Sequence, residues 1–300
     1  MVRGRSVYRA VWIVVWLMNW AIGCVPVRCV PEQVVTPEMV PAATATEVAL
    51  LSCPTATRFR PTETATSAFP KYSPEEGYFI LSELVRTNGG CQFPCWLGIT
   101  PGESSWTEVQ SFFARFDSAI VSSSSHAAIH VPKEFGFYDS VDIQAEFWLE
   151  GDRIVSIKVA SGVWYWFTKA LRELGQPEEI RIQTFSQDAG PYIPFIIVLF
   201  YPSKGIAAVY GDDVLKESPT TLRACLDEDN SFYFWKPDRK LTFEEFQERF
   251  DLEVIEEEPY LPVDKALGMD VATFYQRYKD ALNPICLETP RDLWPNPFGP

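Results

Sequence analysis

A strict alternation of apolar and polar residues from Val141 to Glu150 constrains the fold more than any other feature of the chain. Apolar side chains at every second position are typical of a β-strand that buries one face. Gly151-Asp152 then supplies a turn, and the alternation returns through Val155, Ile157 and Val159. Two alternating runs joined by a short turn predict an antiparallel hairpin.

Helix signals precede this hairpin twice. Ser73 and Glu76 are spaced as a capping box, which satisfies free backbone N–H groups at a helix start, and Asn88-Gly89-Gly90 ends that helix. Ser105 and Glu108 open a second helix in the same way. The apolar residues of the second helix recur at intervals of three and four and predict one buried stripe, formed by Trp106, Val109, Phe112, Phe113 and Phe116.

A helix followed by a hairpin occurs again further along the chain. Residues 163–174 have the periodicity of a helix that stops at Gly175. An edge strand is predicted over residues 180–184, and a hairpin over residues 195–201 and 206–210. The sequence therefore predicts an α+β fold in which two successive helix plus antiparallel β-hairpin units form a two-layer sandwich.

The globular domain is predicted over residues 71–300. Within it, residues 97–160 and 163–211 form the two units of a possible internal duplication, and residues 215–300 form a short helical C-terminal extension.

The extension contains weaker signals. Phe232–Trp235 has the composition of a strand, Thr242 and Glu245 open a short helix, and another helix is predicted over residues 270–282. The Pro-rich tail from Pro290 is predicted to be irregular.

The N-terminus has the pattern of a secretory signal over residues 1–23. Three arginines precede an apolar run, Val11 to Met18, that is shorter than the about 20 residues of a spanning helix. Residues 24–70 are rich in threonine and proline and have too little apolar surface to fold, so they predict a disordered tether.

Ala21-Ile22-Gly23-Cys24 resembles the lipobox of bacterial lipoproteins, and this resemblance implies lipidation of Cys24. Cleavage at an ordinary signal-peptide site nearby and retention of residues 1–23 as an uncleaved signal anchor are the alternatives. All three place the domain outside the cytoplasm, anchored to the cell envelope or released from it.

The chain carries 26 basic and 40 acidic residues, which gives a formal charge of −14. Proteins that bind nucleic acid obtain much of their affinity from basic residues that neutralise phosphates. The charge therefore argues against a nucleic-acid partner.

Seven cysteines in an exported chain indicate disulfides, because the space outside the cytoplasm is oxidising. Four of them lie in the domain and allow three pairings. We expect Cys91 to pair with Cys95, because they are close in sequence, and Cys225 to pair with Cys286, because they remain.

Trp148 falls on the polar face of the predicted hairpin, beside Gln144 and Glu146. An exposed tryptophan on a sheet can stack against a sugar ring or fill a pocket of a partner protein. These three residues form the candidate binding surface. The alternative is a tryptophan that one of the helices or the tail covers.

Three patterns of metal or redox chemistry are weak. His126 and His130 lie in a segment predicted to run from loop into strand, and no acid follows His126 as in the zinc-protease helix. Asp227, Asp229 and Ser231 have the spacing of a calcium loop with Asp238 at its twelfth position, but Phe232 stands where that loop needs glycine. Cys91 and Cys95 are four residues apart instead of the three of a redox motif. We expect no metal and no cofactor.

Two short motifs resemble parts of known families. Gly98-Ile99-Thr100 and Leu174-Gly175-Gln176-Pro177 are similar to the helix opening and the helix end in small outer-membrane-assembly lipoproteins and in β-lactamase-inhibitor proteins. The phrase from Cys91 to Gly102 (Cys-x-x-Pro-Cys-Trp-x-Gly-Ile-Thr-Pro-Gly) resembles one found in uncharacterised exported bacterial proteins. The resemblance implies a two-layer α/β architecture and a role in contacting proteins.

The sequence contains no Gly-x-Ser-x-Gly elbow, Gly-rich phosphate loop or His-Glu-x-x-His helix. We therefore expect a non-catalytic extracytoplasmic binding or interaction module, tethered to the membrane, with a protein or a glycan as its partner. One alternative is an exported hydrolase of wall or polysaccharide that uses two carboxylates. The other is a structural component of the envelope.

Overall fold

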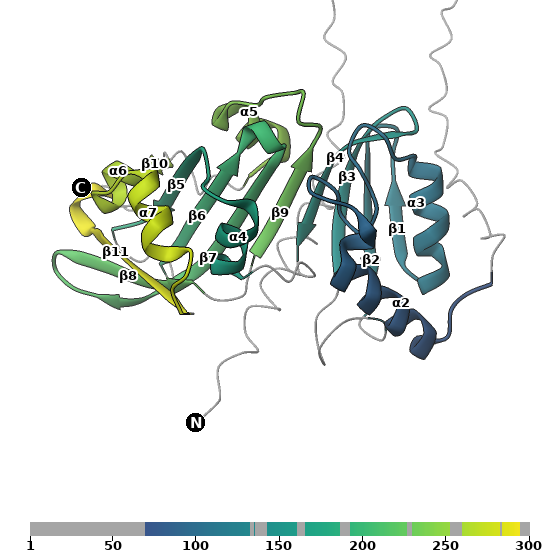
Figure 1. Cartoon of the computed structure of the whole chain (residues 1–300), viewed down its shortest axis with the longest axis horizontal. Helices are drawn as coiled ribbons and strands as arrows, with labels where there is room; N and C mark the ends of the chain where they lie inside the picture. The colour runs from purple at the N-terminus through teal and green to yellow at the C-terminus, as the bar shows by residue number, and fades with distance from the viewer. Residues whose placement is uncertain are drawn as a thin grey trace, which may run out of the picture. The chain divides into compact units, whose positions relative to one another are not determined.

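The computed structural model in Figure 1 describes residues 70–132, 135, 143–160, 166–186, 193–226, 230–252, 260–282 and 284–294. The predicted signal segment, Cys24 and all of the tether except Pro70 lie outside the described residues. The first residues of two predicted elements, 141–142 and 163–165, and the acidic residues Asp227 and Asp229 also lie outside them.

The described residues contain both helices and strands, which confirms the α+β class. The helices are α2 (Pro74–Thr87), α3 (Trp106–Phe113), α4 (Phe167–Leu174), α5 (Phe243–Phe250), α6 (Val263–Leu267) and α7 (Val271–Tyr278). The strands are β1 (Ala119–Ser122), β2 (His126–Val131), β3 (Ile143–Glu150), β4 (Arg153–Ala160), β5 (Glu179–Thr184), β6 (Pro194–Tyr201), β7 (Ile206–Glu217), β8 (Thr221–Leu226), β9 (Asn230–Trp235), β10 (Leu261–Pro262) and β11 (Ile285–Pro290).

The strands form one antiparallel sheet in the order β1-β2-β3-β4-β9-β7-β6-β5-β10, with β8 paired to β7 and β11 paired to β8 (Figure 1). The predicted hairpins are β3–β4 and β6–β7. Strands β4 and β9 pair in the middle of the sheet. Strands β3, β2 and β1 follow on the side of β4, and strands β7, β6 and β5 follow on the side of β9.

Alternation along β9 buries residues on both faces of the sheet. Phe232 and Phe234 share one face with Phe147 of β3, which packs against Trp106 of α3 at a ring-centroid distance of 5.4 Å. We call this the inner face; α4 and α7 pack on it as well, because Phe167 of α4 contacts Tyr210 and Phe274. The other face, the outer face, carries α5.

Helix α5 binds the outer face through aromatic rings. Thr242 and Glu245 form the predicted capping box at its start. Phe246 and Phe250 then contact Tyr233 of β9 at centroid distances of 5.2 and 5.1 Å. Phe200 of β6 lies 5.4 Å from Phe246. Helix α5 therefore covers the part of the outer face around β9 and β6.

Three details differ from the sequence predictions for the hairpins. Ile154, not Val155, is buried on β4, because the register shifts after Trp148 and leaves Val155 as the extra residue of a β-bulge. A further hairpin, β1–β2, precedes β3 where a loop running into a strand was expected. The predicted edge strand β5 has a neighbour, the two-residue strand β10.

The C-terminal third also differs from its prediction. The strand over Phe232–Trp235 is present, but as β9 it lies at the centre of the sheet and not in a separate extension. Helix α7 ends at Tyr278, four residues early. Strand β11 (Ile285–Pro290) lies in a segment for which no element was predicted, and it ends at Pro290, where the irregular tail was predicted to begin.

The β3–β4 turn is fastened to the start of α3. The Asp152 carboxylate accepts hydrogen bonds from the Ser105 hydroxyl (2.6 Å), the Thr107 amide (2.9 Å) and the Thr107 hydroxyl (2.8 Å). These hydrogen bonds lower the pKa of Asp152 below its ordinary value, and the bond from Ser105 has the largest effect. An aspartate at this position satisfies amide groups at the helix start, so the turn caps the helix that covers its own hairpin.

Both expected disulfides are present. The disulfide between Cys91 and Cys95 closes a short loop, and the Cα atoms of the two cysteines lie 6.1 Å apart. The Asn88 side chain donates a hydrogen bond to the Cys95 carbonyl oxygen at 2.8 Å. Cys225 and Cys286 stand directly opposite each other on β8 and β11. The second disulfide therefore ties the last described strand to the sheet.

The turn between β6 and β7 requires glycine at position 205. Gly205 has φ of 66°, and a Cβ atom there would overlap the Trp235 carbonyl oxygen. Gly151 has a similar φ of 64° but open space around it. A left-handed conformation costs about 1–2 kcal/mol for alanine at either site, and the overlap adds about 1–3 kcal/mol at Gly205 alone. We expect Gly205→Ala to lower the free energy of unfolding by about 2 kcal/mol more than Gly151→Ala in urea titrations. Equal losses in the two variants would contradict the close approach of β7 and β9.

The two disulfides close loops of different length, with sequence separations of 61 and 4 residues. The chain-entropy model assigns about 4 kcal/mol to the longer loop and about 2 kcal/mol to the shorter one. We therefore expect Cys225→Ser with Cys286→Ser to destabilise the domain about twice as much as Cys91→Ser with Cys95→Ser, measured by urea unfolding without reductant. The reverse order would show that β11 is not held to the sheet mainly by its cross-link.

Candidate binding surface

The candidate binding residues predicted from the sequence lie on the outer face of β3, in three rows that cross the sheet. The first row is His126, Trp148, Ser156 and Trp235. The second row is Ala128, Glu146, Lys158 and Tyr233. The third row is His130, Gln144, Ala160 and Ser231. Side chains within a row stand on neighbouring strands and are close enough to interact.

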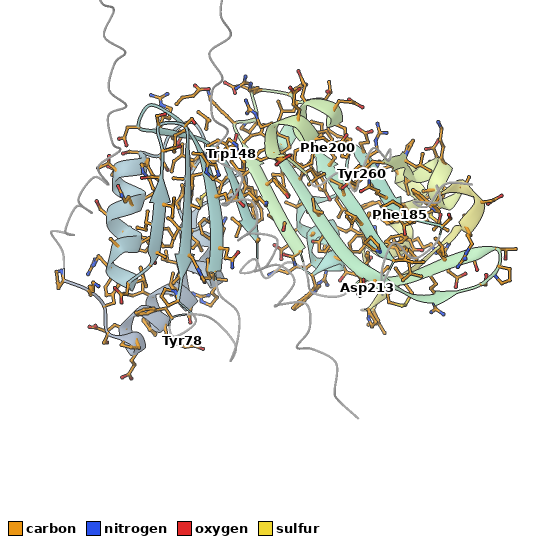
Figure 2. The ribbon with its side chains drawn as sticks, turned by 180° about the vertical axis from the view of Figure 1, so that it is seen from behind. Tyr78, Trp148, Phe185, Phe200, Asp213 and Tyr260 are labelled. Atoms are coloured by element: carbon orange, nitrogen blue, oxygen red, sulfur yellow. A yellow bond between two sulfur atoms is a disulfide. The ribbon has the colours of Figure 1, made fainter. Side chains whose placement is uncertain are left out.

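Helix α5 covers one end of the first row. Trp148 is partly buried, and its ring meets the edge of Phe250 of α5 at a centroid distance of 4.8 Å and an interplanar angle of 81°. Arg249 of α5 also donates to the Ser156 hydroxyl at 3.3 Å. Figure 2 shows Trp148 and Phe200 at the end of the sheet where α5 packs. A helix therefore covers one side of the Trp148 ring, as the alternative interpretation of the sequence held.

Glu146 holds two cationic or potentially cationic neighbours. One carboxylate oxygen lies 3.3 Å from Nε2 of His126, and the other lies 3.2 Å from Nζ of Lys158. Partial burial acts to raise the pKa of Glu146, but the hydrogen bond with His126 and the charge of Lys158 outweigh it, so the pKa lies below its ordinary value. Glu146 is therefore an ionised acceptor at neutral pH.

His126 connects this charged group to the aromatic end of the surface. Its ring lies edge-on to Trp148, with a centroid distance of 5.4 Å and an angle of 77°. Lys158 extends over the Tyr233 ring, 6.0 Å from its centroid. Trp148 is thus held between Phe250 and His126, and the orientation of its ring is set before any ligand arrives.

The third row is the open part of the surface. Gln144 and His130 are exposed, while Ala160 and Ser231 are partly buried. The structure therefore brings together all three residues predicted from the sequence, Trp148, Glu146 and Gln144. Their exposure increases from the aromatic end, which α5 covers, to the open polar end. We call His126, Gln144, Glu146, Trp148 and Lys158 the binding surface.

Sequence reasoning missed His126 and Lys158 as members of this surface. The hairpin turn at Gly151-Asp152 places Glu146 opposite residue 157 in a regular ladder and opposite Lys158 once the bulge adds a residue. The partner of Glu146 could thus have been predicted to within one position. His126 could not, because β2 was not expected to start there.

The residues of the two possible metal-binding patterns in the sequence contact other groups in the structure. His126 and His130 do share the outer face of β2, but His126 contacts Glu146. Ser231 lies in strand β9, and Asp238 pairs with Lys236 at 2.5 Å. Within the described ranges, no three histidine, cysteine, aspartate or glutamate side chains gather as a metal site would require.

The disulfides of the domain indicate the compartment in which it folds. Two disulfides are typical of an oxidising, extracytoplasmic environment. No helix among the described residues is both long enough and apolar enough to cross a membrane.

Comparisons of the chain with models of protein families, with curated proteins and with solved structures find no match.

The lowered pKa of Glu146 predicts a pH effect. A carboxylate whose folded pKa is below its ordinary value of 4.5 stabilises the fold above that pH, and this contribution is lost as pH falls through the folded pKa. We expect Glu146→Gln to be less stable than the wild type in urea at pH 7, and the difference to shrink towards pH 3. Glu150→Gln, at the exposed end of the same strand, is the control and should show little change. A difference for Glu146→Gln that is the same at both pH values would show that the two ion pairs contribute nothing.

Proposed function

We propose that the chain is a non-catalytic binding module that works outside the cytoplasm, tethered to the membrane through the segment before Pro70, and that it binds a protein partner through the binding surface. The observation that carries the proposal is the arrangement of Trp148, Glu146 and Lys158 on a single rigid sheet. Partner-binding surfaces commonly combine a pre-positioned aromatic side chain with polar groups at the rim.

Pre-organisation is the main physical support. Each flexible side chain that a partner must order costs about 0.5–1.5 kcal/mol of binding free energy. Phe250 and His126 already restrict the Trp148 ring, and Glu146 already restricts Lys158. A partner that contacts these side chains therefore loses little affinity to ordering them.

The same geometry makes Glu146 a poor acid catalyst. A general acid for glycoside cleavage needs a raised pKa so that it keeps its proton near neutral pH. His126 and Lys158 hold the pKa of Glu146 below its ordinary value. The Glu146 carboxylate thus favours recognition over hydrolysis.

Site-specific photo-crosslinking in the producing cells tests the proposal. Benzoylphenylalanine is placed at Gln144, in the open third row, and separately at Gln276, an exposed position on α7. We expect a discrete protein adduct from position 144 and none from position 276. Lys158→Glu should reduce that adduct about fivefold or more, as removal of a contact worth at least about 1 kcal/mol would.

Two results would contradict the proposal. Equal adducts from both positions would mean that the binding surface has no special role. An adduct that consists only of a second copy of this chain would favour a structural component of the envelope over a module that recognises another protein.

A further inference from the structure

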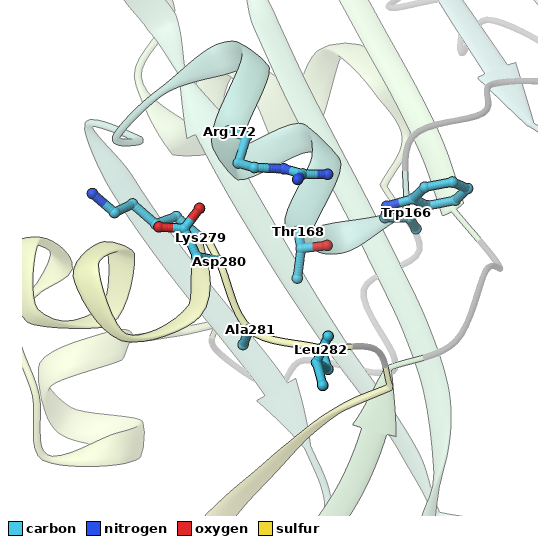
Figure 3. Close-up of a pocket in the computed structure, with 7 residues that line it drawn as sticks. All are labelled: Trp166, Thr168, Arg172, Lys279, Asp280, Ala281 and Leu282. Atoms are coloured by element: carbon cyan, nitrogen blue, oxygen red, sulfur yellow. The ribbon is translucent and has the colours of Figure 1, made fainter.

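A shallow groove of about 280 Å³ lies on the other side of the sheet from the binding surface. Thr168 and Arg172 of α4 form one wall, and Lys279 and Leu282, which follow α7, form the other (Figure 3). Trp166 stands at one end, where it is the N-cap residue of α4. The volume lies just below the range of small-molecule sites, about 300–1,000 Å³, which suits one ring and its substituents.

Trp166 is 40% exposed, whereas the other aromatic residue at the start of α4, Phe167, is buried in the core. An exposed indole ring offers a flat apolar surface with one N–H donor. Leu282, which is 91% exposed, adds a second apolar surface to the groove. A ligand with an apolar ring face that lies on Trp166 would remove part of this apolar surface from water.

The charges of the groove are unbalanced in favour of cations. Within the part of the chain that the structure describes, neither Arg172 nor Lys279 forms an ion pair, while Lys169 one turn before Arg172 is paired with Glu173 at 3.9 Å. Figure 3 shows the Arg172 side chain extended towards the side of the groove where Trp166 stands. Arg172 thus lines the groove together with Trp166, whose ring also has Lys169 6.0 Å from its centroid.

We propose that this groove binds a sugar ring that bears a carboxylate, as in a glycan that contains uronic acid. The planar guanidinium of Arg172 matches a carboxylate with two parallel hydrogen bonds. The apolar face of the ring lies on Trp166, and the Asp280 carboxylate at the rim accepts hydrogen bonds from ring hydroxyls. Asp280 and the net charge of −14 disfavour densely charged anions, so a sparsely charged, hydroxyl-rich ligand fits best.

Calorimetric titration of the purified full-length chain tests this proposal. The probe is a tetrasaccharide of alternating glucuronic acid and N-acetylglucosamine. The matched probe is the same tetrasaccharide with its carboxyl groups reduced to alcohols. We expect the acidic form to bind at least about tenfold more tightly than the reduced form, which corresponds to the loss of one charge-assisted pair.

Variants separate the two contacts. Arg172→Ala should weaken binding of the acidic form about tenfold and leave the reduced form unchanged. Trp166→Ala should weaken both forms. Arg277→Ala removes an exposed cation of α7 that does not line the groove, and it should bind like the wild type. Each variant is compared at an unchanged urea midpoint, so that unfolding is not mistaken for lost binding.

Three outcomes would overturn the proposal. They are no binding of the acidic probe by the wild type, equal binding of the two probes, and equal losses in Arg172→Ala and Arg277→Ala. A short acidic peptide that binds as tightly as the acidic tetrasaccharide would assign the groove to a protein ligand and also overturn it. Lys158→Glu leaves this groove intact, so the result is independent of the proposed protein partner.

Discussion

The rest of the structure depends on the antiparallel pairing of β4 with β9. This ladder runs from Ser156 opposite Trp235 to Ala160 opposite Ser231, and it joins the strands before α4 to those after it. Alternation along β9 places Phe232 and Phe234 in the inner core and Tyr233 and Trp235 under α5. One strand thus supplies the packing surface for helices on both faces, because its side chains alternate between them. Without it, α5 would lose its aromatic contacts with Tyr233 and Trp235, and the sheet would end at two further edges.

The two sites follow from this one strand. The binding surface lies on the outer face, where the coverage by α5 fades from Trp148 towards Gln144. The groove lies on the inner side, where α4 and α7 pack over Tyr210. The side chains of the binding surface stand on β-strands, and Thr168 and Arg172 of the groove stand on α4, which keeps these side chains close to a single geometry. No residue belongs to both of the proposed sites, so a substitution can be made in one without changing the lining of the other.

Local sequence patterns predicted many of the helices and strands, but they did not predict which strands pair over long sequence distances. The capping boxes at Ser73 and Thr242 and the alternation in β3 depend on neighbouring residues, and the structure contains all three. The position of β9 depends on its partner some 75 residues earlier in the chain, β4, which no local pattern encodes. The same limit applies to the site. Trp148 was predicted on the polar face, but its cover by Phe250 comes from a helix about 100 residues later.

Native-state hydrogen exchange tests the account most directly. If β4 and β9 form the centre of one sheet, their amides should exchange only through global unfolding, with the same opening free energy at Val159 and at Phe232. Amides of the edge strand β1, such as that of Val121, should exchange through smaller openings. An opening free energy at Phe232 well below that of Val159 would mean that the two parts of the sheet open separately. The central pairing, and with it the pre-organised binding surface, would then be wrong.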